Sequence, residues 1–370
     1  MHSEVPPDSS REAAGDPADG RPAARGGVAV APPPERPRPE VRPGVPTRRL
    51  VLAFFLPPSL TPEAVKYDRR YRALDKYRFV AWFTLLPLAF YLLLVAWPFV
   101  QAFYYSMTDW SGYGTEFTFI GFDNYVRLWS DSQFWDATRN SLVLLVFAPV
   151  ITLALGLFFA YMLNAGGRHR RNETVSGVFG SKFYKIVYFF PQVLSVAIIA
   201  VIWARAFSPR SGVVNPLLEN VGLGALTQND WLGKYGLWVT LLVLCWSFVG
   251  FYVVLFSASM GSIPKEIYEA SLLDGANRST TFFRITFPLT WDAIRTGWIY
   301  MGIQALDAFA IVSIMIPRQG IDVLPTFLYL KAFRDGQAAY ATAVGVVLFL
   351  ITLTFALLMM RVGRRDRIEF

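Results

Sequence analysis

Apolar residues gather in long runs along most of this chain, and polar segments separate the runs. A helix of about 20 apolar residues crosses the hydrocarbon core of a bilayer, so runs of that length predict membrane-spanning helices. A soluble protein with deeply buried helices is the alternative, but it gives no reason for runs that repeat at span length. The pattern predicts six spans, at Phe79–Ala102, Ser141–Leu163, Ile186–Trp203, Leu237–Ser257, Thr296–Ile316 and Tyr340–Met360.

The N-terminal region lacks this pattern. Residues 1–46 are rich in Pro, Ala, Gly, Arg and Glu and show no apolar period, so they predict a disordered tail. They also lack the basic start and apolar core of a secretory signal peptide. The run "LVLAFFL" at 50–56 is too short to span a bilayer and touches the membrane surface at most. We therefore expect an all-α integral membrane protein with two regions, a disordered Pro/Arg-rich tail at 1–76 and a six-span domain at 77–370.

Composition agrees with a membrane protein, and the placement of charge orients it. Hydrophobic residues make up 54% of the chain and charged residues 17%, below the roughly 25% of an average soluble domain. Lys and Arg concentrate in the N-terminal tail, the C-terminal segment and the loops after the second and fourth spans, and such residues favour the cytoplasmic side. Both termini are therefore expected in the cytoplasm. This placement accounts for the net charge of +8 without nucleic acid.

Few residues could carry catalysis or bind a metal. Cys245 lies within an apolar run and has no second cysteine to pair with, and His2 and His169 are far apart in polar segments. A disulfide, a metal site or a histidine-based active site is therefore not expected. The phosphate-binding pattern G-x-x-x-x-G-K-[ST] does not occur in the sequence, so any ATP hydrolysis must come from another subunit. No cofactor is expected.

The segment between the first two spans reads "SGYGTEFTFIGFDNYVRLWSDSQFWDATRN". Its aromatic and turn residues predict either a small packed cap or an aromatic belt at the membrane interface, and the sequence favours neither. Prolines also fall in or beside the spans. They indicate bent helices around a pathway, although helices without a pathway also bend, and they lie at Pro87, Pro98, Pro149 and Pro191.

An organised polar segment, "EIYEASLLDGANRSTTFFRITFPLTW", joins the fourth and fifth spans on the cytoplasmic side. Pro264 suits the first turn of a helix and Ser262 suits a cap, so a short helix is expected to run to Leu273. Gly275 then allows a left-handed turn, and Ser279–Thr280 restart a helix. Such a protrusion could insert into a groove of another protein or lie on the lipid surface, and the physical pattern leaves both open.

This segment resembles the EAA loop of the permease subunits of ABC importers. The family pattern is Glu-Ala-Ala, three residues, Gly, nine residues, Ile, one residue and Leu-Pro, and every gap matches here. Ser271 stands for the second Ala and Phe287 for the Leu, while "DGA" is typical of the carbohydrate branch. The stretches "GFDNYVRLW", "YFFPQVLS" and "WSFVGFYVVLF" resemble other signatures of that branch. The residues assigned to the loop site are Glu269, Ala270, Ser271, Asp274, Gly275, Ala276, Ile285 and Pro288.

The resemblance implies a permease without an ATPase site of its own, whose loop is a coupling helix docked on a cytoplasmic P-loop ATPase dimer. It also implies a second homologous permease subunit and an extracellular substrate-binding (lipo)protein. The transported solute would be a sugar, either a mono- or oligosaccharide or an amino sugar, imported across a bacterial plasma membrane. A glycerol-phosphate or polyol permease is one alternative. An ion-coupled secondary transporter is another, but it calls for several carboxylates along the path, and the spans offer essentially one.

That carboxylate is Asp307, near the middle of the fifth span. A charge there costs at least about 2.5–3.5 kcal/mol on insertion, so it is expected to face the protein interior or a wet path, where a carboxylate accepts hydrogen bonds from sugar hydroxyls. Gln304 lies one turn earlier on a similar face. Pairing of Asp307 with a partner subunit is the alternative. Trp246 and Tyr252 could contact a sugar ring, but packing is the commoner role of such side chains.

Overall fold

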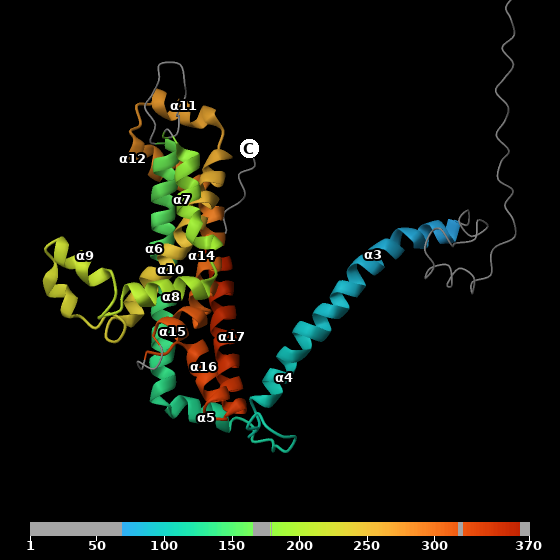
Figure 1. Cartoon of the computed structure of the whole chain (residues 1–370). Coiled ribbons are helices and arrows are strands. Elements are labelled where there is room, and N and C mark those ends of the chain that lie inside the picture. Colours follow the sequence, from blue (N-terminus) through green and yellow to red (C-terminus); the bar gives the residue numbers. More distant parts are fainter. Residues whose placement is uncertain (1–68, 166–177, 179, 317–320, 363–370) are drawn as a thin grey trace, which may run out of the picture. The chain divides into compact units, whose positions relative to one another are not determined.

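The computed structural model describes residues 69–165, 178, 180–316 and 321–362. The rest of the chain lies outside the described residues, including His2, His169 and most of the expected disordered tail at 1–76. The chain divides into two units, residues 1–85 and residues 86–370. Of the first unit only residues 69–85 are described, the start of α3 (Arg69–Tyr91), and the second unit holds all the other described elements (Figure 1).

The described secondary structure is almost entirely helical, as the sequence predicts, and one isolated β-bridge pairs Thr108 with Phe119. In chain order the elements are α3 (Arg69–Tyr91), a π turn (Leu92–Ala96), α4 (Trp97–Tyr105), α5 (Asp123–Ser130), α6 (Ser132–Ala165), α7 (Ser181–Val193), α8 (Val196–Ala206), α9 (Val214–Asn220), a 3₁₀ turn (Gly224–Gln228), α10 (Gly236–Gly261), α11 (Lys265–Leu273), α12 (Arg278–Thr281), a second π turn (Phe282–Thr286), α13 (Phe287–Leu289), α14 (Trp291–Leu306), α15 (Phe309–Met315), α16 (Leu324–Phe333) and α17 (Ala338–Arg361).

Six apolar segments of the described chain have the length of a membrane span when each bent helix pair is counted once. Two of them are bent, α7 with α8 by 94° and α14 with α15 by 41°. The expected third span, Ile186–Trp203, corresponds to α7 with α8, and the chain turns sharply between these helices where Leu194 and Ser195 adopt extended backbone. The four continuous segments are Val80–Tyr105, Ser132–Asn164, Gly236–Gly261 and Ala338–Arg361.

Proline accounts for much of this irregularity. In an α-helix the proline ring clashes with the carbonyl four residues earlier and supplies no N–H donor. Pro98 and Pro288 each follow a π turn, whose wider winding gives the ring room. Pro191 lies in the last turn of α7, just before the 94° bend. Of the four prolines named from the sequence, Pro191 lies next to the 94° bend and Pro98 follows a π turn, whereas Pro87 and Pro149 lie inside α3 and α6.

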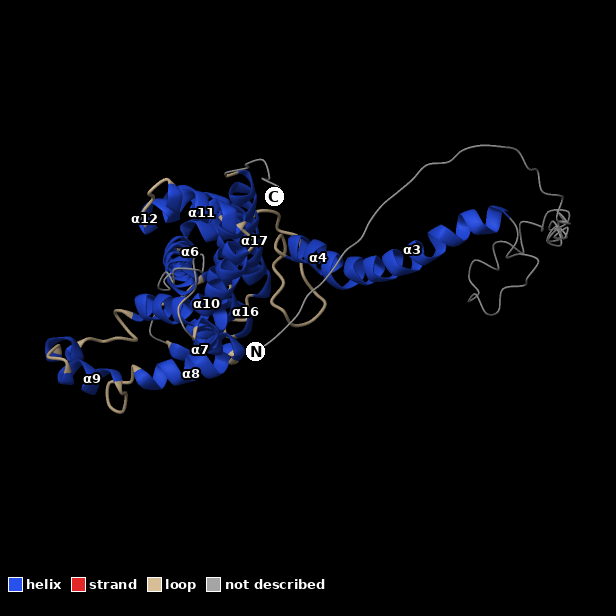
Figure 2. Ribbon diagram, turned by 90° about the horizontal axis from the view of Figure 1, so that it is seen from above, coloured by secondary structure: helices blue, strands red, loops and turns tan. Residues whose placement is uncertain are grey.

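The core of the second unit is built around α10, which Figure 2 shows among the other helices of the bundle. A helix that is apolar on all sides is normally buried, and the side chains of Tyr252 and Phe256 are fully enclosed. Glycines let the neighbouring helices approach α10 closely. A Cβ atom added to Gly156 of α6 would lie 2.6 Å from the Cβ of Tyr252, and one added to Gly250 would overlap the carbonyl oxygen of Tyr188 in α7. Small residues at such contacts are typical of membrane helix packing.

The segment between the first two spans forms a packed cap at the end of the bundle opposite α11 and α12 (Figure 1). The buried amide of Asn124 donates hydrogen bonds of 2.9 and 2.8 Å to two backbone carbonyls of the segment. The guanidinium of Arg127 lies 4.3 Å from the centre of the Tyr340 ring, and the Tyr340 hydroxyl donates to the Asp131 carboxylate at 2.6 Å. Of the two alternatives for this segment, the structure shows the cap, on which rings such as that of Trp129 stay exposed.

The chain between α15 and α16 is fastened to α6 at the cap end. The Asn140 amide donates to the backbone carbonyl of Asp322 at 2.9 Å, and the Ser141 hydroxyl accepts from the Leu324 N–H at 2.9 Å. The Thr326 hydroxyl lies 3.2 Å from the Asp322 carboxylate. Burial raises the pKa of Asp322 above its usual 3.8, and the hydrogen bond from Thr326 only partly opposes that shift. At neutral pH the Asp322 carboxylate is ionised, and burial of this charge lowers the stability of the folded state.

Replacing Asp322 with asparagine is expected to raise the melting temperature at pH 7, by at most about 4 °C, because the amide removes a half-buried charge and still accepts from Thr326. The pKa of Asp322 is higher in the folded chain than in the unfolded chain, so protonation of Asp322 stabilises the fold at pH values below the unfolded pKa. This stabilisation is lost as the pH rises through the folded pKa. The gain should therefore disappear when the pH falls below 3.8. Thermal unfolding in detergent at both pH values measures it. Asp136→Asn, at an exposed carboxylate of the same surface hollow, should show no such gain, and a lower melting temperature for Asp322→Asn at pH 7 would contradict the expectation.

Candidate functional site

The organised polar segment becomes a helix–turn–helix at one end of the bundle, named here the 265–289 loop (Figure 1). Its first helix is α11, which begins at Lys265 because Pro264 is extended, with ψ 136°. The prediction that Ser262 caps this helix is wrong. The Ser262 hydroxyl donates to the carbonyl of Ser259 at 2.8 Å, and Pro264 takes the cap position instead of the first turn.

The end of α11 follows the sequence prediction closely. Gly275 adopts a left-handed conformation with φ +73°, which residues other than glycine rarely adopt. Its N–H donates to the Leu272 carbonyl at 3.1 Å, and the N–H of Ala276 donates to the Ser271 carbonyl at 3.0 Å. This pair of bonds is the Schellman motif, which satisfies carbonyls that a helix end leaves unpaired. The turn is thus fixed by the backbone and by one glycine.

The second helix starts at Arg278, one residue before the Ser279–Thr280 pair that was expected to start it. Asn277 is the cap, because its side-chain oxygen accepts the Thr280 N–H at 2.8 Å. Asparagine is among the best N-cap residues, so "NRST" carried a readable signal that the sequence interpretation missed. α12 then continues through the π turn and α13 toward α14.

The two faces of the 265–289 loop differ. Ser271 is buried, and its hydroxyl donates to the Tyr268 carbonyl at 2.8 Å, so the small residue at this motif position lets α11 lie close to the rest of the chain. Leu273 and Phe283 point outward and are 89% and 69% exposed. Two exposed apolar side chains on a rigid turn, with charged residues around them, form a surface suited to a protein groove. The charged residues of the loop are Lys265, Glu266, Glu269, Asp274, Arg278 and Arg284, of which Glu269 is half-buried.

The loop is also tied to a span that is distant in sequence. The hydroxyl of Tyr161 in α6 donates to the backbone carbonyl of Arg278 at 2.7 Å, and its ring packs on Phe282 with 4.8 Å between centroids. Tyr161 was not singled out from the sequence, where a tyrosine near the end of an apolar run looks like an interfacial anchor. Two matched motif positions lie beyond α12, with Ile285 in the π turn and Pro288 in α13.

The expected pathway residues fall into two groups. Asp307 directly follows α14 at the 41° bend, and its side chain is exposed. Gln304 is half-buried one turn earlier, and Trp246 on α10 is 38% exposed with its ring edge-on to Trp203. Tyr252 is different. It is fully buried, and its hydroxyl donates to the Gly297 carbonyl at 3.0 Å, so it packs α10 against α14 in this conformation.

Among the described residues, no hydrogen bond or ring contact joins these four side chains to one another. The side chain of Asp307 likewise has no hydrogen-bond or ion-pair partner within the described chain, and only its backbone N–H is bonded, to the Ile303 carbonyl at 3.0 Å. The described residues contain no group of His, Cys, Asp and Glu side chains that could hold a metal ion. Asp307 and Gln304 lie at the broken span formed by α14 and α15, whereas Trp246 and Tyr252 lie on the continuous helix α10, so the four residues do not form an assembled binding site in this conformation.

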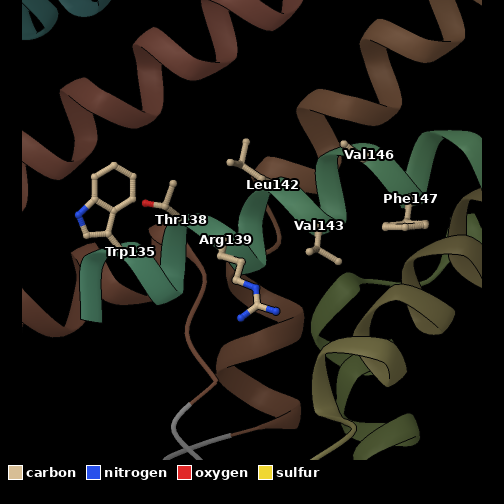
Figure 3. Close-up of a pocket in the computed structure, with 7 residues that line it drawn as sticks. All are labelled: Trp135, Thr138, Arg139, Leu142, Val143, Val146 and Phe147. Atoms are coloured by element: carbon tan, nitrogen blue, oxygen red, sulfur yellow. The ribbon is translucent and has the colours of Figure 1, made fainter. Parts of the chain in front are cut away.

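A separate hollow of about 340 Å³ follows the side of α6 (Figure 3). Its lining is almost wholly apolar, which suits a lipid chain or a neighbouring helix better than a sugar. Thr138 directs its hydroxyl to its own helix, donating to the Phe134 carbonyl at 2.8 Å. The lining residues all belong to α6 and are Trp135, Thr138, Arg139, Leu142, Val143, Val146 and Phe147.

Apolar helices of span length, two of them broken, together with a structured polar loop at one end, define a multi-pass membrane protein. The family model described as "Binding-protein-dependent transport system inner membrane component" matches residues 172–367, which include the whole loop and the last four spans. The chain belongs to this family.

Individual relatives extend the similarity to most of the chain. The diacetylchitobiose uptake system permease protein NgcF of Streptomyces coelicolor is 39% identical over 302 residues, which cover 80% of this chain and 85% of that protein. The xylose/arabinose import permease protein XacH of Haloferax volcanii is 32% identical and covers 67% and 76%. A crystal structure of a bacterial alginate ABC transporter, in complex with a periplasmic protein that holds an alginate pentasaccharide, matches with a TM-score of 0.65. At 22% identity over 81% of this chain, that match shows the fold, and the all-α membrane architecture expected from the sequence is confirmed.

Proposed function

We propose that this chain is the translocation subunit of a binding-protein-dependent ABC importer for a sugar. Membership of the family supports the transport role, and two relatives of more than 30% identity are named for uptake of diacetylchitobiose and of xylose or arabinose. The relative named for diacetylchitobiose has the higher identity and the wider coverage, which favours an oligosaccharide of amino sugars. The hydroxyl and amide groups of such a solute need hydrogen-bond partners along the path. The described spans contain few charged residues, so most of these partners would be neutral polar groups.

The observation that carries the coupling role is the construction of the 265–289 loop. Its turn is held by a Schellman motif, its second helix is capped by Asn277, and its outer surface exposes Leu273 and Phe283. A flexible connector between two spans would need none of these features. We assign the loop to docking on a cytoplasmic P-loop ATPase dimer, with the residues that match the motif forming the docked surface and its support: Glu269, Ala270, Ser271, Asp274, Gly275, Ala276, Ile285 and Pro288.

The chain then works by alternating access. ATP binding closes the two ATPase subunits, displaces the docked loops and opens the path to the outside, where an extracellular binding protein delivers the solute. Hydrolysis and product release return the spans to the inward-open state. The described chain performs no covalent step in this cycle, and a second homologous permease supplies the other half of the path. From the positive-inside rule we expect both termini and the 265–289 loop to lie in the cytoplasm of a bacterial cell.

The first experiment is affinity purification of this chain from gently solubilised native membranes, followed by identification of what accompanies it. The proposal expects a P-loop ATPase and a second six-span protein in amounts comparable to the bait. It also expects transport of an amino-sugar oligosaccharide when these components and the binding protein are reconstituted in vesicles. A chain that purifies alone or as a homodimer would instead indicate a self-sufficient, ion-coupled transporter.

We assign Asp307, Gln304 and Trp246 to the substrate path, and Tyr252 to the packing that supports it. A break in a membrane helix exposes backbone groups and side chains to a path, and irregular backbone at that depth is tolerated where it lines a cavity. Asp307 directly follows α14 at such a break. Its carboxylate accepts hydrogen bonds from hydroxyl groups, which suits a neutral sugar.

Replacing Asp307 with alanine is expected to lower the apparent affinity for transported sugar by about 10- to 100-fold, since a hydrogen bond to a charged group contributes about 1.5–3 kcal/mol. The amount of ATPase that co-purifies should not change. Uptake of labelled sugar by reconstituted vesicles measures the effect. Asp292→Ala is the matched control, because Asp292 is an exposed carboxylate at the start of the same helix, paired only with Arg295 at 3.5 Å. Normal uptake by the Asp307 variant would remove Asp307 from the path.

A further inference from the structure

We infer that Tyr161 is a positioning residue that makes α6 move with the 265–289 loop. This inference rests on the proposed coupling role of the loop, and it adds a residue outside the loop motif. The family pattern identifies the surface that an ATPase would contact. It does not identify what transmits a displacement of that surface to spans that are not attached to it. The contacts of Tyr161 provide such a connection.

Only two spans are covalently continuous with the 265–289 loop. The 265–289 loop continues directly from α10 and into α14, so these helices must follow any displacement of the loop. α6 and α7 precede α10 in the chain and have no such attachment. They can respond to the loop only through side-chain contacts or through α10, and α6 packs along both α10 and α14.

Tyr161 makes a short, enclosed contact with the first turn of α12. Its side chain is 7% exposed, and its hydroxyl donates to the Arg278 carbonyl at 2.7 Å. The same carbonyl accepts the N–H of Phe282, and the ring of Phe282 packs on the ring of Tyr161. The phenol therefore holds both the backbone and a side chain of the loop. A tyrosine has few rotatable bonds, so such a contact transmits a displacement with little slack.

The other contacts of α6 extend the connection. One turn beyond Tyr161, the Asn164 amide donates to the Ser257 hydroxyl of α10 at 2.9 Å. The Asn164 side-chain oxygen accepts from the Lys185 ammonium of α7 at 3.2 Å. This end of α6 is thus joined to α10, to α7 and, through Tyr161, to the loop. A push on the 265–289 loop would then move these helix ends as one body.

The contact within the loop itself is weaker. The hydroxyls of Tyr268 and Thr286 lie 3.4 Å apart, at the long limit of a hydrogen bond, and they join α11 to the π turn without reaching another span. The loop is folded chiefly by the backbone hydrogen bonds of Gly275 and Ala276 and by the Asn277 cap, so loss of the Tyr161 hydroxyl should leave the loop folded and free its motion from that of α6. This outcome separates a transmitting role from a purely structural one.

The test uses the complete importer reconstituted in vesicles, with sugar transported and ATP hydrolysed measured in the same sample. Tyr161→Phe keeps the ring and removes only the hydroxyl. It is expected to lower the sugar transported per ATP about fivefold, which corresponds to one hydrogen bond of about 1 kcal/mol, while the ATPase co-purifies in normal amount. Tyr188→Phe is the matched control, since the Tyr188 ring stacks on Phe159 of α6 at 4.9 Å and its hydroxyl has no hydrogen-bond partner among the described residues.

A second readout is hydrogen–deuterium exchange of the backbone of residues 277–284 in the purified chain, expected to be several-fold faster in Tyr161→Phe than in Tyr188→Phe. Unchanged transport per ATP in Tyr161→Phe would overturn the inference, as would an equal loss in both variants. Failure of the proposed function would look different, because the wild-type chain would then retain no ATPase at all.

Discussion

Replacing Gly275 with valine is expected to weaken the association of the ATPase with this chain by about tenfold. Gly275 ends α11 at φ +73°, and the left-handed region costs other residues roughly 1–2 kcal/mol, most of all a β-branched one. Because about 1.4 kcal/mol changes an equilibrium tenfold, a strained turn would lower the fraction of loops that can dock by that factor. The valine side chain would also project from an exposed turn into the surface assigned to docking.

Gly275→Asn is the control for this variant. Asparagine tolerates the left-handed region, so the hydrogen bonds from Gly275 and Ala276 to the end of α11 should persist, and binding should stay within about threefold of wild type. A Cβ at position 275 meets no atom of this chain within 4 Å, so a loss in the valine variant would not reflect a clash inside the permease. Titration of detergent-purified chain with the ATPase subunit measures both variants. Equal, wild-type binding by both would show that the turn geometry is not needed.

Replacing Gly250 with alanine is expected to destabilise the membrane domain strongly, by about 1–3 kcal/mol or more, the range seen when a well-packed core is overfilled. The added methyl group would overlap the carbonyl oxygen of Tyr188 and lie 2.7 Å from the backbone nitrogen of Phe189. Backbone atoms cannot rotate away as a side chain can, so α7 must shift along its length. Reduced yield of monodisperse protein and a lower melting temperature in detergent would report this effect.

Gly261→Ala tests the same substitution in the same helix without the overlap. Gly261 is the last residue of α10, and a Cβ there would have no atom within 4 Å. Alanine favours helix over glycine by up to about 1 kcal/mol, so this variant should melt at or slightly above the wild-type temperature. If Gly250→Ala and Gly261→Ala behave alike, the close approach of α7 to α10 does not limit stability.

The sequence predicted the spans well because a bilayer imposes length and polarity together. Each apolar run has a counterpart in the structure, and the N-terminal boundary of the last span is placed within two residues, at Tyr340 against Ala338. α6 starts at Ser132, well before the expected Ser141, because polar residues beside Phe134 and Ala137 form its first turns. Those turns pack under the cap and lie outside the apolar run. Hydropathy detects only the apolar part of a helix.

The sharp break after α7 could not be read from the same signal. Pro191 indicated a bend, but a proline in a sequence does not predict the angle of the bend. The helix also continues to Val193 before the chain turns. The 94° angle depends on where α8 finds partners, and α8 packs along α15, the second half of the other broken span. Which spans pair is decided by residues more than a hundred positions apart. A pattern read along one run does not contain this information.

The residues of the candidate site show the same difference between local signals, which the sequence carries, and long-range contacts, which it does not. Gly275 could be predicted because left-handed backbone selects for one residue type, so the turn is written into the sequence. Tyr161 could not, because its role depends on a backbone carbonyl 117 positions away that every residue carries. Asp307 was noticed for its charge, and its position at a break of α14 and α15 adds a reason for the charge to be there.

The cap places a constraint on how the protein is made. The Asp131 carboxylate accepts a hydrogen bond from Tyr340, 209 positions later, in addition to one from the nearby Gln133 N–H. The Arg127 guanidinium donates to the Gln337 side chain, 210 positions later, at 2.8 Å. Both partners belong to the start of α17 or the residue before it, and α17 is the last of the described spans in chain order. Throughout synthesis, the two charges of the cap therefore lack these partners and must stay hydrated. A chain that stops before α17 could insert most of its spans yet never close its cap, and this open cap would distinguish an unfinished permease from a complete one at the membrane surface.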